Sequence, residues 1–134
     1  QKFIPGNEIS VDAFLDENYK MVGLFMRKRE HVINGESQVT SIFRNHKLAS
    51  SFAKYFESLK LTGMVMLQAK IYKNKPYIIE CNPRVGGAST LSIQNGLDAF
   101  FWQMKKVINK RFVYKFKKGK KNRLFRFPVD FYLK

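Results

Sequence analysis

The stretch Glu80-Cys81-Asn82-Pro83-Arg84-Val85-Gly86-Gly87 decides how the rest of the chain is interpreted. An apolar run at residues 77–79 precedes it, and strand side chains alternate between faces, so Glu80 and Asn82 project to the same side. The proline ends the strand, and Arg84 follows beside two glycines that let the backbone approach a ligand closely. Oxygen ligands hold Mg²⁺ and the Arg fork binds phosphate oxygens, so the stretch suits a metal–phosphate site. A plain strand end, a turn and a solvated arginine would give the same sequence.

Gln68 strengthens the metal hypothesis, because it lies in a preceding strand pattern at residues 63–72. A three-residue turn at 73–75 would place Gln68 directly opposite Glu80, and opposed residues of antiparallel strands share a face. Gln68, Glu80 and Asn82 would then form one oxygen-rich cluster. A two-residue turn would shift the register by one and put Gln68 on the wrong face. Chance placement of a polar side chain on a strand face is the competing explanation.

Composition limits the class of protein. The 134 residues are 45% hydrophobic, with thirteen Phe and six Tyr, which indicates one folded domain. The lone Cys81 excludes an internal disulfide and predicts a reduced core residue in a cytoplasmic protein. No apolar stretch approaches the roughly 18 residues of a membrane span. The chain begins at Gln1 without an initiator Met, so we expect residues 1–134 to be one domain from a longer protein.

Periodicity predicts an α+β fold. Short turns join most of the strands, so the sheet should be largely antiparallel, with helices packed on one face. The expected strands are residues 8–15, 19–26, 38–43, 63–72, 76–82, 111–117 and 124–127, and the expected helices are 45–60, 89–95 and 98–109.

Taken together, the motifs resemble the ATP-grasp superfamily, and within it the branch of the carbamoyl-phosphate synthase large subunit and its small ligase relatives. The resemblance runs from about Phe3 to the last expected strand. It rests on the leading strand at residues 8–16, Arg27-Lys28-Arg29, Gly35-Glu36-Ser37, Gln68, and the block at residues 80–87. It implies the C-terminal subdomain of an ATP-grasp ligase, an enzyme that joins a carboxylate to an amine through an acyl-phosphate, using ATP and Mg²⁺ or Mn²⁺.

The resemblance also implies roles for single residues. Glu80 is expected to ligate the metal that bridges the ATP phosphates, and Gln68 takes the other metal-side position, where many relatives carry an acid. Asn82 is expected to help hold the second metal and the phosphates. Arg84 is the expected catalytic residue, holding the transferring γ-phosphate or the acyl-phosphate. Glu8 takes the position that contacts the ribose hydroxyls. Such roles fit phosphoryl transfer, in which catalysis is mostly positioning and charge neutralisation.

One departure from the family pattern is large. The N-terminal ATP-grasp portion, with the lysines and the glycine-rich loop that cover the phosphates, has no counterpart in this sequence. We therefore expect weak or no ATP binding and no turnover by residues 1–134 alone. Isothermal titration that gave micromolar affinity for Mg·ATP would contradict this expectation. The sequence does not identify the acceptor carboxylate or the nucleophile.

Charge supplies an alternative. Eleven of the 25 basic residues lie within 105–126, which contains no acid. Basic and aromatic residues are interleaved over residues 105–127, so this tail is also compatible with a nucleic-acid-binding module. No recognised RNA-binding signature accompanies it, which makes a nucleic-acid partner the weaker prediction. A non-catalytic scaffold that kept the fold is a third option, against which the retained Glu80, Asn82 and Arg84 argue. Arg27 and Arg29 either face the proposed cleft or form a solvated basic edge.

Overall fold

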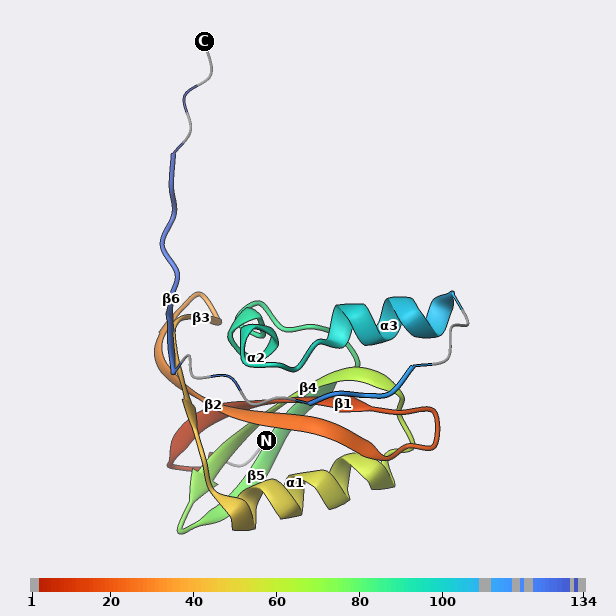
Figure 1. The fold of residues 1–134 in the computed structure, drawn as a ribbon. Coiled ribbons are helices and arrows are strands. Elements are labelled where there is room, and N and C mark those ends of the chain that lie inside the picture. Colours follow the sequence, from red (N-terminus) through yellow and green to blue (C-terminus); the bar gives the residue numbers. More distant parts are fainter. Residues whose placement is uncertain (1–2, 109–111, 117–118, 120–121, 131, 133–134) are drawn as a thin grey trace.

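One six-stranded antiparallel sheet organises the computed structural model, which describes residues 3–108, 112–116, 119, 122–130 and 132 (Figure 1). The strand order is β5-β4-β1-β2-β3-β6, and every neighbouring pair is antiparallel. The predicted α+β class and largely antiparallel sheet are therefore confirmed. The elements are β1 (Asn7–Leu15), β2 (Met21–Ile33), β3 (Glu36–Phe43), α1 (His46–Ser58), β4 (Gly63–Tyr72), β5 (Lys75–Asn82), α2 (Thr90–Gln94), α3 (Ala99–Val107) and β6 (Arg123–Phe125).

Strand β1 lies near the centre of the sheet and separates two environments by its alternation. Its odd-numbered residues Ile9, Val11, Ala13 and Leu15 are buried in the core beneath α1. That core is completed by Leu48, Phe52 and Phe56 of α1, together with Met26, Val65, Leu67 and Ala69. The even-numbered positions of β1 face the opposite side, which carries the polar groups described below.

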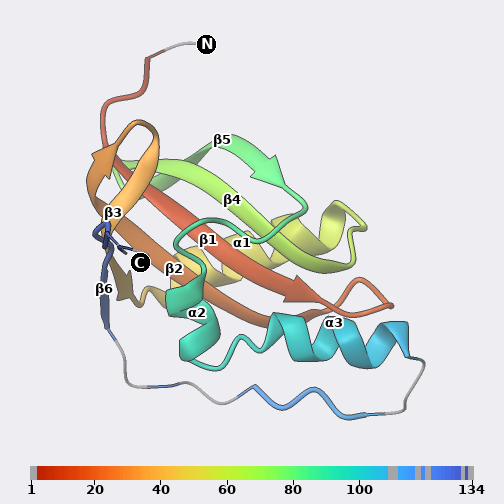
Figure 2. The same ribbon diagram turned by 90° about the horizontal axis from the view of Figure 1, so that it is seen from above.

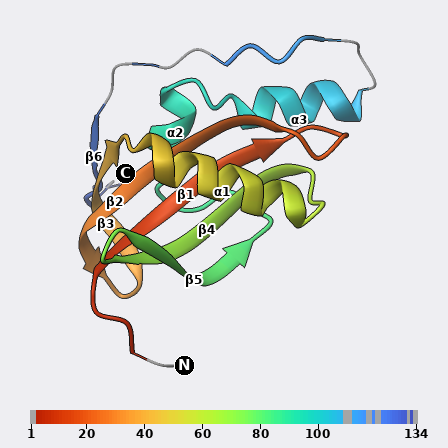
Figure 3. The same ribbon diagram turned by 90° about the horizontal axis from the view of Figure 1, so that it is seen from below.

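Helices cover both faces of the sheet, whereas the sequence predicted them on one face only. Figure 3 shows α1 lying across one face, and Figure 1 shows α2 and α3 on the other. The reason is Phe14, which alternation places on the polar side of β1 but which still requires burial. The Trp102 ring of α3 covers Phe14 with a centroid distance of 5.0 Å, within a second core that also contains Phe25 and Leu97.

The C-terminal segment differs from the predicted hairpin. The described residues of the expected strand, 112–116, form no strand and run alongside α3 (Figures 1 and 2), while residues 111 and 117 lie outside the described residues. Strand β6 pairs instead with β3. Three aromatics of this segment pack against the second core, where burial and a hydrogen bond to Glu17 (2.8 Å) raise the pKa of Tyr114 to about 12. The three aromatics are Phe112, Tyr114 and Phe116, and their packing makes them unavailable for base stacking. Phe125 and Phe127 of the same tail stay exposed.

Strand β2 extends further than predicted, because the polar run at residues 27–31, which follows the expected strand 19–26, continues the strand against β3. This extension matters for the site, since it carries Arg27 and Arg29 along the sheet instead of into solvent. Within the residues that the structure describes, no helix has the length and apolar character needed to cross a membrane.

Candidate functional site

The turn that joins β4 to β5 contains two residues, whereas the sequence predicted three. Tyr72 pairs with Lys75, which leaves only Lys73 and Asn74 between the strands. Their φ angles of 48° and 59° lie in the left-handed region that two-residue hairpin turns require. By itself, this shorter turn would place Gln68 on the face opposite to Glu80.

A β-bulge restores the predicted register. Ala69 pairs with Ile78, but the next pair is Gln68 with Glu80, so Ile79 is the extra residue on the bulged strand. Gln68 and Glu80 are therefore directly opposed and share one face of the sheet, as the sequence analysis predicted. The turn length was predicted wrongly and the resulting pairing correctly, because the bulge compensates for the missing turn residue.

Asn82 extends this pair of oxygen donors along β5. It lies opposite Met66, and its Nδ2 donates a hydrogen bond to Glu80 Oε1 at 2.9 Å. Cys81, between Asn82 and Glu80, lies opposite Leu67 and packs against the α1 core. Burial raises the pKa of the Cys81 thiol. The cysteine thus points away from the polar cluster, as predicted.

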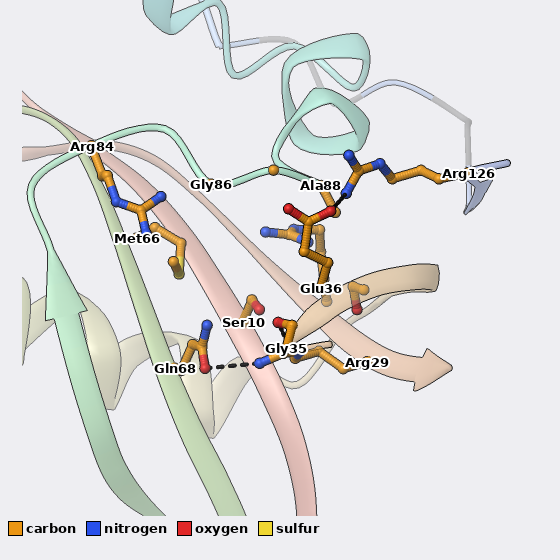
Figure 4. A pocket seen from close by; sticks show the side chains of 13 residues that line it. Ser10, Arg29, Gly35, Glu36, Met66, Gln68, Arg84, Gly86, Ala88 and Arg126 are labelled. Carbon is orange, nitrogen blue, oxygen red and sulfur yellow. Dashed lines mark hydrogen bonds and ion pairs between the residues drawn. The ribbon is translucent and has the colours of Figure 1, made fainter. Parts of the chain in front are cut away.

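Arg29 connects two of the predicted site residues. Its Nη1 donates to Gln68 Oε1 at 2.8 Å (Figure 4) and also forms an ion pair with Glu8. The Arg29 side chain is only 6% exposed, so the alternative of a solvated basic edge is wrong for this residue. Glu8 and Gln68, which come from the neighbouring strands β1 and β4, meet through one guanidinium.

A polar pocket of about 140 Å³ opens beside these residues. Gln68 and Arg84 contribute to its wall, whereas Glu80 and Asn82 lie outside the lining, on the adjacent strand. Four of the lining side chains are arginines, which favours an anionic ligand. The lining residues are Ser10, Arg27, Arg29, Gly35, Glu36, Ser37, Met66, Gln68, Arg84, Gly86, Gly87, Ala88 and Arg126.

The four arginines are not equivalent. Arg27, Arg29 and Arg126 form ion pairs with carboxylates, the last with Glu36 at 3.2 Å. Arg84 forms no ion pair with a carboxylate of the described residues, and its Nη1 donates to its neighbour's backbone, Val85 O, at 3.2 Å. Among these four cations, Arg84 is consequently the one whose charge is available to a ligand.

Ser37 adds a neutral donor to the pocket wall. It is 7% exposed, and its Oγ has no hydrogen-bond partner within the described part of the chain. Because a buried hydroxyl without a hydrogen-bond partner is costly, binding of an oxyanion that accepted a hydrogen bond from Ser37 Oγ would be favoured.

Behind the pocket lies a buried polar cluster, here called the Asp12 network and comprising Asp12, Arg27, Ser89 and Ser92. Asp12 and Arg27 are 0% and 2% exposed and form a two-point ion pair, with distances of 2.7 Å to Nε and 3.0 Å to Nη2. Ser89 Oγ donates to Asp12 Oδ1 at 2.7 Å and Ser92 Oγ donates to Oδ2 at 2.5 Å. Four hydrogen bonds therefore satisfy one fully buried carboxylate.

The donor set at the β4–β5 pair suits a hard divalent cation bound to phosphate. Glu80 supplies a carboxylate and Asn82 an amide oxygen. The Gln68 amide oxygen accepts from Arg29 Nη1 at 2.8 Å and would have to exchange this hydrogen bond for the metal. Mg²⁺ is typically held by one or two carboxylates together with substrate phosphates and water. Among the described residues, no group of three or more His, Cys, Asp or Glu side chains converges on one point. An all-protein metal cage is therefore absent from the described part, and the chemistry fits a metal that arrives with a nucleotide.

Sequence reasoning missed the Asp12 network, Ser37 and Arg126. A signal for the first was present, because Asp12 shares the polar face of β1 with Glu8, and a β2 extended to Arg27 places this cation diagonally beside it. Arg126 follows β6 and reaches the pocket only through the β3–β6 pairing, a long-range contact without a local sequence pattern.

Residues 1–125 match the family model described as ATP-grasp in the biosynthetic pathway with Ter operon. The chain belongs to this ATP-grasp family. No curated protein sequence matches it significantly. The resemblance stated from the sequence motifs is thereby confirmed at the level of the ATP-grasp superfamily.

Solved ATP-grasp structures share the fold at low sequence identity. The biotin carboxylase of Campylobacter jejuni, in complex with β-γ-ATP, superposes with a TM-score of 0.68 at 17% identity, over 84% of this chain and 28% of its own. The biotin carboxylase domain of a thermophilic 2-oxoglutarate carboxylase bound to bicarbonate gives 0.69 at 14% identity, over 85% and 28%.

A third solved structure is the biotin carboxylase domain dimer of Hydrogenobacter thermophilus 2-oxoglutarate carboxylase in complex with MgADP, ADP and bicarbonate. It gives a TM-score of 0.64 at 14% identity, over 81% of this chain and 26% of its own. The chain thus spans little more than a quarter of the length of these ATP-grasp structures.

Proposed function

We propose that this ATP-grasp chain is the ATP- and magnesium-binding part of a ligase that joins a carboxylate to an amine, or forms carbamoyl phosphate, through an acyl-phosphate. The observation that carries the proposal is the opposition of Gln68 and Glu80 on one sheet face, with Asn82 beside them. Arg84, which forms no ion pair with a carboxylate of the described residues, lies in the loop that follows this strand. Family membership supplies the reaction class, and the C. jejuni and H. thermophilus structures were solved with nucleotides.

In this reaction a carboxylate oxygen attacks the γ-phosphorus and ADP leaves with the electrons of the broken P–O bond. The amine nitrogen then attacks the acyl carbon, inorganic phosphate leaves, and the amine loses its proton to solvent. Positioning and charge neutralisation dominate catalysis of such transfers. Arg84, with the Ser37 hydroxyl at the pocket wall, would hold the transferring phosphoryl group or the acyl-phosphate.

The remaining roles follow the same arrangement. Glu80, Gln68 and Asn82 would hold Mg²⁺ on the nucleotide phosphates, and the metal would neutralise charge on the transferring group. Glu8 would reach the ribose only if it exchanged its ion pair with Arg29 for a ribose hydroxyl. We also propose that residues 1–134 form one cytoplasmic domain that corresponds to the later part of an ATP-grasp module and acts with an N-terminal portion.

Binding of Mn²⁺ tests the proposed metal site, because this paramagnetic ion broadens nearby amide signals even when it binds weakly. In a ¹⁵N-labelled sample of the chain with ADP, substoichiometric Mn²⁺ should broaden the backbone amides of residues 66–69, 79–82 and 84 first. Glu80→Gln should weaken Mn²⁺ binding by about tenfold or more, because the single carboxylate of the donor set is lost.

Glu57→Gln is the matched control, since Glu57 belongs to α1 on the opposite face of the sheet and its contacts are with Met21 and Lys20. It should leave Mn²⁺ binding unchanged. Broadening centred away from β4 and β5, or equal effects of the two variants, would refute the proposed metal site.

A further inference from the structure

The loop that follows β5 carries Arg84 and forms one wall of the pocket through Gly86, Gly87 and Ala88. We propose that Ser89, held by Asp12, is a positioning residue of the ligase site: it fixes this loop against the sheet so that Arg84 faces the bound anion. The inference rests on the proposed function, because it assigns the loop to the anion that Arg84 would hold.

Ser89 links the buried carboxylate to the loop backbone. Its Oγ donates to Asp12 Oδ1 (2.7 Å) and accepts a hydrogen bond from Gly86 N (3.0 Å). Both oxygens of Asp12 accept hydrogen bonds from Arg27, and the single hydroxyl proton of Ser89 is donated to Asp12 Oδ1. Ser89 Oγ therefore acts as an acceptor toward the Gly86 amide, and also toward Arg27 Nη2 in a longer contact of 3.4 Å.

A second hydrogen bond closes this link into a ring. The Ser89 backbone amide donates to Gly86 O at 3.0 Å, so that each of the two residues both donates to and accepts from the other. Both ends of the ring are buried, because Ser89 is 0% exposed and Gly86 lies against Met66 of β4. The loop is therefore fixed two residues after Arg84, at the point where it passes over the sheet.

The close packing around Gly86 also supports the conclusion that Ser89 anchors this loop. A Cβ at this position would lie 3.0 Å from Ser89 Oγ and 3.2 Å from Met66 Cγ, closer than ordinary contact. Glycine allows the loop to approach both the hydroxyl and the strand. An added methyl group would displace the loop from the same anchor without removing any member of the Asp12 network.

Ser92 provides an internal comparison. It is also 0% exposed and also donates to Asp12, at 2.5 Å to the second oxygen. It makes no hydrogen bond to the 83–88 loop that the structure describes. Loss of either hydroxyl thus removes one hydrogen bond to the same carboxylate. Loss of the Ser89 hydroxyl removes two further contacts, the long one from Arg27 Nη2 (3.4 Å) and the one from Gly86 N (3.0 Å), and only the latter holds the loop.

The test compares Ser89→Ala with Ser92→Ala in the 134-residue chain, using inorganic pyrophosphate with Mg²⁺ as the probe. Affinity is followed by the ¹⁵N shifts of Gly87 and the Arg84 Nε–H. Ser89→Ala should weaken pyrophosphate binding by about tenfold, whereas Ser92→Ala should stay within about twofold of the unaltered chain. The Gly86 amide should exchange with solvent faster in Ser89→Ala only, and Ser89→Thr, which keeps the hydroxyl, should restore both values.

The outcomes separate the two proposals. Equal pyrophosphate affinities for Ser89→Ala and Ser92→Ala would overturn the positioning role and leave the proposed function intact. An unaltered chain whose pocket amides did not respond to pyrophosphate would overturn the proposed function and the positioning role with it. If Ser89→Ala did not fold, Gly86→Ala would take its place and should show the same loss of affinity relative to Ser92→Ala.

Discussion

Asp12→Ala is expected to lower the free energy of unfolding by about 3–5 kcal/mol, because it leaves the Arg27 guanidinium buried without its counter-ion. The same change removes the acceptor of Ser89 and Ser92, so two more buried polar groups lose their partner. A loss of this size is a large fraction of the stability of a small domain. Urea unfolding followed by circular dichroism measures it.

Glu36→Ala is the control for this prediction, because the Glu36–Arg126 pair is partly exposed and solvent screens it. Its effect should be within about 1 kcal/mol. The double variant Asp12→Ala/Arg27→Met should recover part of the loss, since it removes the unpaired charge as well. An Asp12→Ala protein as stable as Glu36→Ala would show that the buried pair contributes nothing to folding.

Phe14→Ala is expected to cost about 3–5 kcal/mol, the range for a large aromatic side chain deleted from a core. Phe14 is 0% exposed and has Trp102 and Tyr114 at centroid distances of 5.0 and 5.9 Å. Its loss should leave a cavity between the sheet and α3 and loosen the 112–116 segment. Thermal unfolding, with Trp102 fluorescence as the local probe, reports both effects.

Phe100→Ala serves as the matched control, because this side chain of α3 is 57% exposed and the same number of atoms is removed. Its effect should be less than about 1 kcal/mol. If Phe14→Ala and Phe100→Ala destabilised the protein equally, α3 would not pack on the sheet as described.

Local patterns were sufficient for most of the fold. Alternation located β1, β4 and β5, and helical spacing of apolar residues located α1, whose cap Asn45 accepts from Leu48 N at 3.1 Å. The face of the sheet on which each helix packs was harder to predict, because the apolar pattern of a helix does not indicate which face it covers. The 112–116 segment was misread because aromatic side chains at every second position suit an extended segment packed on a core as well as a strand.

The candidate site was predicted where it depends on neighbours along one hairpin. Gln68 and Glu80 are opposed as expected, whereas the roles of Glu8, Gln68, Glu80, Asn82 and Arg84 toward ATP and metal stay predictions. Contacts between distant segments were beyond local reasoning. The hydrogen bond from Ser92 to Asp12 joins residues that are 80 positions apart, and the periodicity of neither segment predicts it.

The extra residue at Ile79 has a consequence for comparing this chain with its relatives. A homologue with one more residue in its hairpin turn and an unbroken ladder would present the same acid and amides in the same place. The extra turn residue and the missing bulge residue offset each other, so the two sequences would align without a gap and Gln68 and Glu80 would fall in matching columns. Residues 75–78 would nevertheless be matched one position out of structural register, although nothing in the binding surface had changed. The glutamate therefore keeps its alignment column, and superposition of backbones is needed only to compare the β5 side chains between the turn and the bulge.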